Sequence, residues 1–301
     1  MINAESPKWF KEVLAKEPEK LSIKVKGANI TYNAWGDKKN PGILFVHGGM
    51  AHADWWSFIA PYFLETHRVI ALNLGGMGDS TWRKEYSTEL WGEEIVKVCE
   101  KEKLKKTIIV GHSLGGLCCV VAASQFKSKL YGLVIVDTAI VPPSKVPDKL
   151  DFKIKANKIY KSVNDAKSRF RLVPPQGEGL DYIMEYIADK SLKQVKNGWT
   201  WKFDPQYMKM FTASGFKKRQ EVYSKKLRAL KCRVAVFRGE KSFFFQGGTD
   251  KYMHELLDKK SPIISIPEAH HHIMVDQPLA LISALRALVI DWDHSKPEKS
   301  T

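Results

Sequence analysis

The segment that decides the fold is Thr107-Ile108-Ile109-Val110-Gly111-His112-Ser113-Leu114-Gly115-Gly116. Its first four residues form a short apolar run, which is typical of a strand buried on both faces. A helical pattern over residues 114–126 follows directly. The glycines between the two patterns leave room for a very tight turn. The segment therefore predicts a strand, a sharp turn that presents Ser113, and a helix whose N-terminus lies beside the serine.

Short apolar runs recur outward from this segment, at residues 43–46, 69–72, 133–136 and 234–237. Helical patterns such as 89–103 separate them, and strands that alternate with helices imply βαβ crossovers. Residues 22–26 and 29–33 instead alternate apolar and polar side chains around a glycine, which predicts an antiparallel hairpin at the sheet edge. The predicted fold class is α/β, with a mostly parallel central sheet of about eight strands flanked by helices, the last of them over 279–292.

The stretch from about Pro142 to Lys231 departs from this alternation. It contains helical patterns interrupted by Pro174-Pro175, Gly177 and Gly179, and no strand-like run. A stretch of this length is too long for a loop, so it is interpreted as an inserted helical subdomain. The predicted organisation is a core made of residues 1–141 and 232–301, with a helical insertion over 142–231.

The composition describes a globular chain. Of the 301 residues, 44% are hydrophobic and 11% aromatic, which excludes wholesale disorder. No apolar stretch is long enough for a membrane span, and the first twenty residues hold no secretory signal pattern, so a soluble cytoplasmic protein is expected. The four cysteines, 99, 118, 119 and 232, are too few and too irregularly spaced for a disulfide framework or a zinc site. Cys118 and Cys119 are interpreted as small buried apolar residues.

Positive charge is concentrated in the insertion. Residues 140–231 hold 21 Lys and Arg against 9 Asp and Glu, a net charge of +12 out of +15 for the chain. The clusters Lys217-Lys218-Arg219 and Lys225-Lys226 indicate either attraction for anionic substrates or, more commonly, a solvated helix face. No nucleic-acid-binding motif accompanies the charge, so no nucleic-acid partner is expected. The insertion is also rich in side chains that suit a pocket or its own packing: Tyr182, Met184, Tyr186, Trp199, Trp201, Phe203, Tyr207, Met208, Met210 and Phe211.

Residues 111–115 match the pattern G-x-S-x-G in the strand–turn–helix context of a nucleophile elbow. On this motif, the chain resembles the serine-dependent, esterase-like members of the α/β-hydrolase superfamily over about residues 21–292. Residues 46–49 with Trp55-Trp56 are similar to the family's oxyanion loop. Residues 73–80 resemble its D-x-x-G-x-G-x-S loop, with Asn73 in place of the aspartate. In such relatives the helical insertion forms a cap over the site.

The resemblance implies roles for individual residues. Ser113 is the expected nucleophile, and one histidine of 270–272 the expected general base, because a serine hydroxyl needs a neighbouring base. In the family the base stands seven residues before the proline of this block, here Pro278, which selects His271. His270 and His272 are then interpreted as orienting or packing residues.

The expected oxyanion hole consists of two backbone N–H groups. One belongs to Leu114, the residue after the nucleophile. The other belongs to Gly49, with Met50 as the neighbouring alternative.

The triad acid has two candidates. Most of the family carries an aspartate in a G-x-x-D pattern after the strand that corresponds to 234–237, but this chain has Gly239-Glu240-Lys241-Ser242. Some relatives place the acid at the end of the preceding strand, where Asp137 stands. Asp137 is favoured as the orienting acid, Glu240 is the alternative, and a strand-end cap is the purely structural interpretation of Asp137.

The predicted function is hydrolysis of a small carboxylic ester or lactone through an acyl-enzyme on Ser113. The expected partner is a small-molecule acyl substrate, and the reaction requires no metal or organic cofactor. Carbon–carbon bond hydrolysis of diketone-like substrates uses the same machinery and is an alternative. A non-catalytic ligand receptor with a capped pocket is the alternative from another class. The serine nucleophile argues against the haloalkane dehalogenase and epoxide hydrolase branches, and the sequence assigns no oligomeric state.

Overall fold

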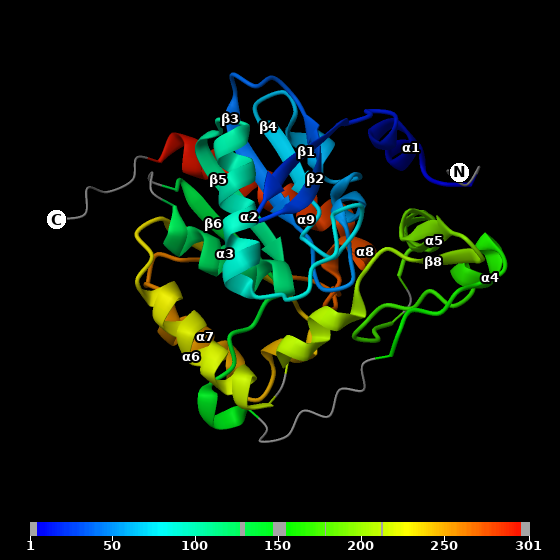
Figure 1. Ribbon diagram of the computed structural model, residues 1–301. Coiled ribbons are helices and arrows are strands. Elements are labelled where there is room, and N and C mark those ends of the chain that lie inside the picture. The colour runs from blue at the N-terminus through cyan, green and yellow to red at the C-terminus, as the bar shows by residue number, and fades with distance from the viewer. Residues whose placement is uncertain (1–4, 127–129, 147–154, 178, 212, 296–301) are drawn as a thin grey trace.

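An eight-stranded sheet runs through the centre of the computed structural model (Figure 1), which describes residues 5–126, 130–146, 155–177, 179–211 and 213–295. The strands lie in the order β1-β2-β4-β3-β5-β6-β9-β10. Their bounds are β1 Glu19–Val25, β2 Ala28–Trp35, β3 Pro41–Val46, β4 Arg68–Leu72, β5 Lys105–His112, β6 Gly132–Val136, β9 Arg233–Gly239 and β10 Ile263–Ile266. The predicted fold class is confirmed.

The strand directions follow the sequence patterns. β1 and β2 pair antiparallel at one edge, and β2 pairs antiparallel with β4. Every other neighbouring pair of the sheet is parallel. Except for the edge strand β10, whose Ser265 is exposed, the parallel strands are largely buried on both faces, which is why they are continuous apolar runs. Their carboxyl ends therefore meet at one edge, where β5, β6 and β9 lie side by side.

Helices cover both faces of the sheet (Figure 1). On one face α2 (Thr88–Lys101) and α3 (Leu114–Gln125) pack against side chains such as Leu44 and Ile109. On the other face lie α1 (Lys8–Leu14) and α9 (Pro278–His294), whose apolar side chains surround Phe45 and Val110. The remaining helices of the core are α7 (Thr249–Leu256) and the short α8 (Ile273–Asp276).

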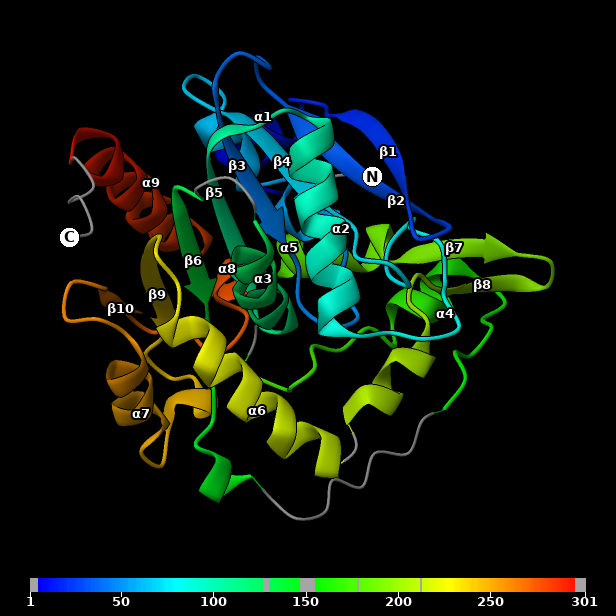
Figure 2. The same ribbon diagram turned by 60° about the vertical axis from the view of Figure 1, so that its left-hand side comes forward.

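The insertion between β6 and β9 lies beyond the carboxyl ends of the parallel strands (Figure 2). It contains α4 (Val163–Lys167), α5 (Asp181–Lys190), the 3-10 helix η4 (Pro205–Phe211) and α6 (Ala213–Arg228). Residues 147–154, 178 and 212 of the predicted insertion lie outside the described residues.

The prediction that the insertion has no strand was wrong. β7 (Leu192–Val195) and β8 (Gly198–Trp201) form a separate antiparallel hairpin. Each strand has four residues, too few for a clear alternation of apolar and polar side chains. The turn consists of Lys196-Asn197, and the sequence signal for it is Asn197 followed by Gly198, which begins β8 with φ 140°.

The cysteines and the membrane-span expectation can both be compared with the structure. Cys118 and Cys119 are fully buried in the cluster formed by α3 and the sheet, as expected for small apolar residues. Over the described ranges, none of the helices combines the length and the apolar character that crossing a bilayer demands.

Candidate active site

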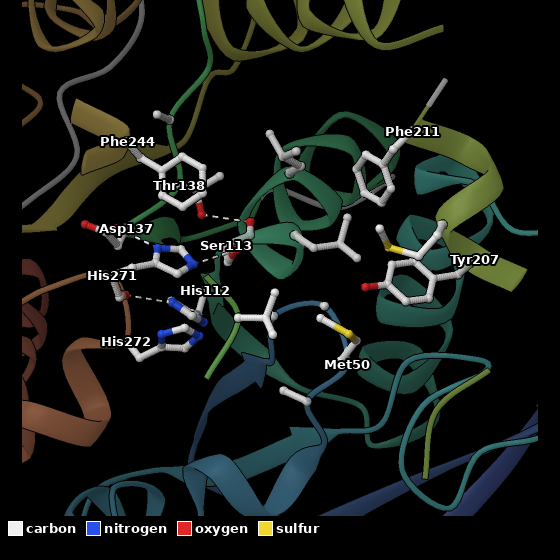
Figure 3. A pocket seen from close by; sticks show the side chains of 18 of the residues that line it. Met50, His112, Ser113, Asp137, Thr138, Tyr207, Phe211, Phe244, His271 and His272 are labelled. Carbon is white, nitrogen blue, oxygen red and sulfur yellow. Dashed lines mark hydrogen bonds and ion pairs between the residues drawn. The ribbon is translucent and has the colours of Figure 1, made fainter. Parts of the chain in front are cut away.

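Ser113 lies in the turn between β5 and α3, at the carboxyl edge of the sheet. Its backbone has φ 53° and ψ −122°, a conformation that costs about 1–3 kcal/mol in a residue other than glycine. After the turn, the backbone of α3 lies so close to the loop after β3 that only glycine fits at position 115. A Cβ there would lie 2.4 Å from the His47 carbonyl oxygen. The Ser113 carbonyl accepts a hydrogen bond from the Gly116 N–H at 2.9 Å. The strained turn directs the serine hydroxyl into a cavity (Figure 3).

His271 follows β10, and its ring lies beside Ser113 at the wall of the cavity (Figure 3). Its Nε2 lies 3.1 Å from Ser113 Oγ, and its Nδ1 lies 2.7 Å from Asp137 Oδ2. Residues from three distant parts of the chain thus form one continuous line of hydrogen bonds. In this line Nδ1–H donates to the carboxylate and Nε2 is free to accept the serine proton.

Asp137 is the first residue after β6, and its φ of 42° turns the chain sharply there. Its Oδ1 accepts the Gly239 N–H at 2.8 Å, and its Oδ2 accepts the Ser242 hydroxyl at 2.6 Å. Ser242, which stands where the G-x-x-D pattern has its aspartate, therefore binds the carboxylate that follows the neighbouring strand. This role of Ser242 was missed, although the G-x-x-S pattern was its signal.

Glu240 does not join this group. Its side chain is exposed, and its Oε2 accepts the Glu268 N–H at 2.9 Å. Although β6 and β9 are neighbours, only the carboxylate after β6 contacts the imidazole. Of the two candidate acids, the structure brings Asp137 to His271.

Burial determines the electrostatics of the pair. It lowers the pKa of His271, so the imidazole is neutral and able to accept a proton. Burial raises the pKa of Asp137, while the hydrogen bonds from Ser242 and Gly239 oppose that rise. These two donors therefore favour the ionised carboxylate that the imidazole needs.

The other histidines of the site have supporting contacts. His272 Nδ1 lies 2.8 Å from Gln176 Oε1, and the ring lines the cavity. His270 Nδ1 lies 3.0 Å from Asp276 Oδ2 and does not reach Ser113. His112 Nε2–H donates to the His271 carbonyl at 3.0 Å, and burial lowers the pKa of His112 to about 3. His112 thereby holds the backbone of His271, a contact that the sequence analysis did not foresee.

Three backbone N–H groups are available for an oxyanion. Leu114, Gly49 and Met50 all line the cavity, and within the described ranges none of their N–H groups donates a hydrogen bond. The Ala51 N–H donates to the Gly48 carbonyl at 3.3 Å, and Met50 has φ 61°, so this loop makes a tight turn. The Leu114 N–H is the first of α3, where the helix dipole favours negative charge.

The cavity has a volume of about 300 Å³ and lies between the core and the insertion. No lysine or arginine is among the described residues that line it. Its apolar walls come from both parts of the chain, with Leu117 and Phe244 from the core and Met208 and Phe211 from the insertion. Tyr207 Oη reaches over the oxyanion loop, where a Cβ on Gly49 would lie 2.8 Å from it.

The expected pocket residues of the insertion lie in several places, and Trp201 and Phe203 line a second cavity. Tyr207, Met208 and Phe211 line the cavity at Ser113. Tyr182 and Tyr186 instead pack on Phe10 of α1, with ring centroids 4.9 and 5.7 Å apart. The aromatic side chains of α5 therefore dock the insertion on the core.

The described residues contain no group of three His, Cys, Asp or Glu side chains that could hold a metal ion. What the site does contain is a hydroxyl, a buried imidazole, a carboxylate and unused N–H groups at the edge of an apolar cavity. This set is sufficient for nucleophilic attack on a carbonyl carbon, with the proton taken up by the imidazole.

Comparison with known proteins matches residues 41–257 to the family described as the alpha/beta hydrolase fold. The chain is 23% identical over 280 residues to an esterase of Mycobacterium tuberculosis, covering 88% of both chains. It is 21% identical over 274 residues to a serine hydrolase-like protein of Danio rerio, covering 83% of this chain and 82% of the relative.

Two solved structures have a similar fold. The thioesterase domain from the curacin biosynthetic pathway superposes with a TM-score of 0.74 at 19% identity, over 89% of this chain and 99% of that domain. The crystal structure of the Mycobacterium tuberculosis esterase superposes with a TM-score of 0.70 at 19% identity, over 96% of this chain and all of the other. At these identities the likeness concerns the fold.

Proposed function

The chain belongs to the alpha/beta hydrolase fold family, and we propose that it is an esterase-like serine hydrolase that cleaves a small carboxylic ester or lactone. The observation that supports this proposal is the line of hydrogen bonds from Ser113 through His271 to Asp137 at the wall of the cavity. The esterase and the serine hydrolase-like protein among the relatives are consistent with it.

In the proposed reaction, Ser113 Oγ attacks the carbonyl carbon of the ester while His271 Nε2 takes the hydroxyl proton. Asp137 stabilises the resulting imidazolium. The carbonyl oxygen becomes an oxyanion, which the N–H groups of Leu114 and Gly49 bind. When the carbonyl re-forms, the alkoxide leaves with the proton from His271, and Ser113 carries the acyl group. Water, deprotonated by His271, then attacks the acyl carbon. The bond to Ser113 Oγ breaks, this oxygen takes the proton back from His271, and the acid is released.

The cavity favours uncharged acyl groups. Its walls are apolar, and the described lining holds no lysine or arginine that would neutralise an acid. On the insertion side the polar lining residues are Gln220 and Tyr207. The Tyr207 hydroxyl reaches over the oxyanion loop and has no hydrogen-bond partner in the described structure. An apolar cavity with a few placed polar groups is typical of sites for small organic ligands.

A fluorophosphonate probe tests the proposal against the receptor alternative. The probe phosphonylates an activated serine, so we expect labelling of the wild-type chain and none of Ser113→Ala. Ser124→Ala is the matched control, because Ser124 lies on the same helix and its hydroxyl donates to the Val121 carbonyl. Failure of the folded wild-type protein to react would contradict the enzyme assignment and favour a ligand receptor.

A further inference from the structure

A second cavity, of about 210 Å³, adjoins the first. Its lining includes Met50, Val173 and His272, which also line the cavity at Ser113. Gly49 and Trp55 are shared as well, so five residues lie at the boundary between the two spaces. The second cavity therefore lies next to the cavity at Ser113, on the other side of these shared residues.

The second cavity differs from the first in charge. Arg169 and Arg171 line it, and no aspartate or glutamate is among its described lining. In the described part of the chain, neither arginine forms an ion pair. Arg171 Nη1 donates to the carbonyl oxygens of Ser168 and Phe170 at 3.0 and 2.6 Å, which holds the guanidinium in place and leaves its other N–H groups free.

Aromatic rings form another wall of this cavity. Phe170 and Trp201 have ring centroids 6.0 Å apart, and both line the cavity together with Phe203. Both arginines are exposed, so water competes for their charge, and binding depends on two forked guanidinium donors that lie beside this aromatic wall.

We propose that this cavity, lined by Arg169 and Arg171, binds an oxyanionic group of the substrate, a carboxylate or a phosphate. The neutral part of the same substrate occupies the apolar cavity. The planar guanidinium matches both oxyanions because it donates parallel N–H bonds. The proposal rests on the proposed function and narrows it to esters with one anionic end. The excess positive charge of residues 140–231 attracts such substrates toward the site.

Matched ester pairs test this proposal. On the acyl side, the p-nitrophenyl monoester of adipic acid is compared with p-nitrophenyl hexanoate, which carries a methyl group in place of the terminal carboxylate. On the alcohol side, the butyrate esters of 4-hydroxybenzoate and of 4-hydroxyphenyl phosphate are compared with that of neutral 4-hydroxybenzamide. The last comparison separates a carboxylate from a phosphate as the preferred group.

We expect the wild-type enzyme to favour an anionic ester over its neutral partner by about threefold in kcat/KM, in at least one pair, which is the range for an ion pair with exposed arginines. The Arg169→Ala/Arg171→Ala variant should lose most of that ratio. The control is Lys217→Ala/Lys218→Ala, which removes the same charge from exposed positions on α6 and should keep the ratio.

Three outcomes overturn the proposal. One is the absence of any anionic preference in wild type while the neutral esters are hydrolysed. Another is an equal loss of the ratio in both double variants, which would assign the preference to overall charge. The third is that wild type hydrolyses no ester at all, and this result would overturn the proposed function together with the inference.

Discussion

Asp137 accepts three hydrogen bonds, from His271, Ser242 and the Gly239 N–H. A carboxylate that is buried and fully paired cannot rotate, so it holds the imidazole in one tautomer and one orientation. Asp137, which follows β6, therefore connects the end of β9 to the imidazole that follows β10.

Replacing the acid tests this role. Asp137→Asn should lower kcat by at least about 100-fold and by as much as about 10⁴-fold, because the amide no longer stabilises the imidazolium or the productive tautomer. Glu240→Gln is the matched control, and its exposed carboxylate should contribute little. Steady-state kinetics with a p-nitrophenyl ester measures both. The opposite ranking would transfer the acid role to Glu240.

Removing the Ser242 hydroxyl should change the pH dependence. The hydrogen bond from Ser242 lowers the pKa of Asp137, so its loss in Ser242→Ala raises that pKa further. Activity is present above the pKa of the acid and is lost as the pH falls through it. The acidic limb of the kcat/KM profile should therefore move to higher pH in the variant. Ser265→Ala, at an exposed position of β10, should leave the limb in place, and an unmoved limb in Ser242→Ala would contradict the assignment.

At the scale of elements, the β5–turn–α3 unit depends on close contact between backbones. Gly115 lies against the end of β3, and the contact lets α3 begin directly above the sheet. A side chain at this position would separate the helix from the strand that precedes the oxyanion loop. The glycine therefore serves both folding and the proposed oxyanion hole.

Gly115→Ala should lower the free energy of unfolding by about 1–3 kcal/mol, because its Cβ would meet the His47 carbonyl oxygen and rigid backbone cannot yield cheaply. Urea denaturation followed by circular dichroism measures the change. Gly177→Ala is the control, since the atom nearest its Cβ would be 3.4 Å away, and it should change stability by less than about 0.5 kcal/mol. Equal stability of the two variants would show that α3 can shift freely.

At the scale of the whole molecule, the apolar cavity exists only because the insertion lies over the core. Leu117 belongs to α3, whereas Met208 and Phe211 belong to η4. Contacts across the boundary hold the two parts together, such as the hydrogen bond of 2.7 Å that Tyr86 Oη donates to Asp204. The size of the acyl group that fits is therefore a property of the assembled molecule.

Met208→Trp should shift the preference toward shorter acyl chains, because the larger side chain fills part of the cavity of about 300 Å³. The ratio of kcat/KM for p-nitrophenyl hexanoate over p-nitrophenyl acetate should fall by about tenfold, because the loss of pocket space for a methylene group changes substrate discrimination by about this factor. Lys209→Trp, at the exposed neighbouring position, should keep the wild-type ratio. An unchanged ratio in Met208→Trp would place the acyl chain elsewhere.

By itself, the sequence determined the parallel sheet, its antiparallel edge and the turn that presents Ser113. Each of these depends on local patterns: buried runs, an alternating hairpin and a glycine-flanked serine between strand and helix. The short β7–β8 hairpin was not predicted, because strands of four residues are too short to show a clear alternation of apolar and polar side chains. Spacing to Pro278 indicated His271 only through the resemblance to the family.

The tertiary structure decided which groups touch. Asp137 and Glu240 follow neighbouring strands, and only the strained backbone at Asp137 directs a carboxylate to the imidazole. Likewise, charge counting located an excess in the insertion but could not distinguish Lys217 and Lys218 of α6, which line neither cavity at the site, from the two arginines that line the second cavity, although all four are exposed. Contacts between residues more than a hundred positions apart depend on the packed chain as a whole, because neither local propensity nor spacing encodes the direction of a side chain.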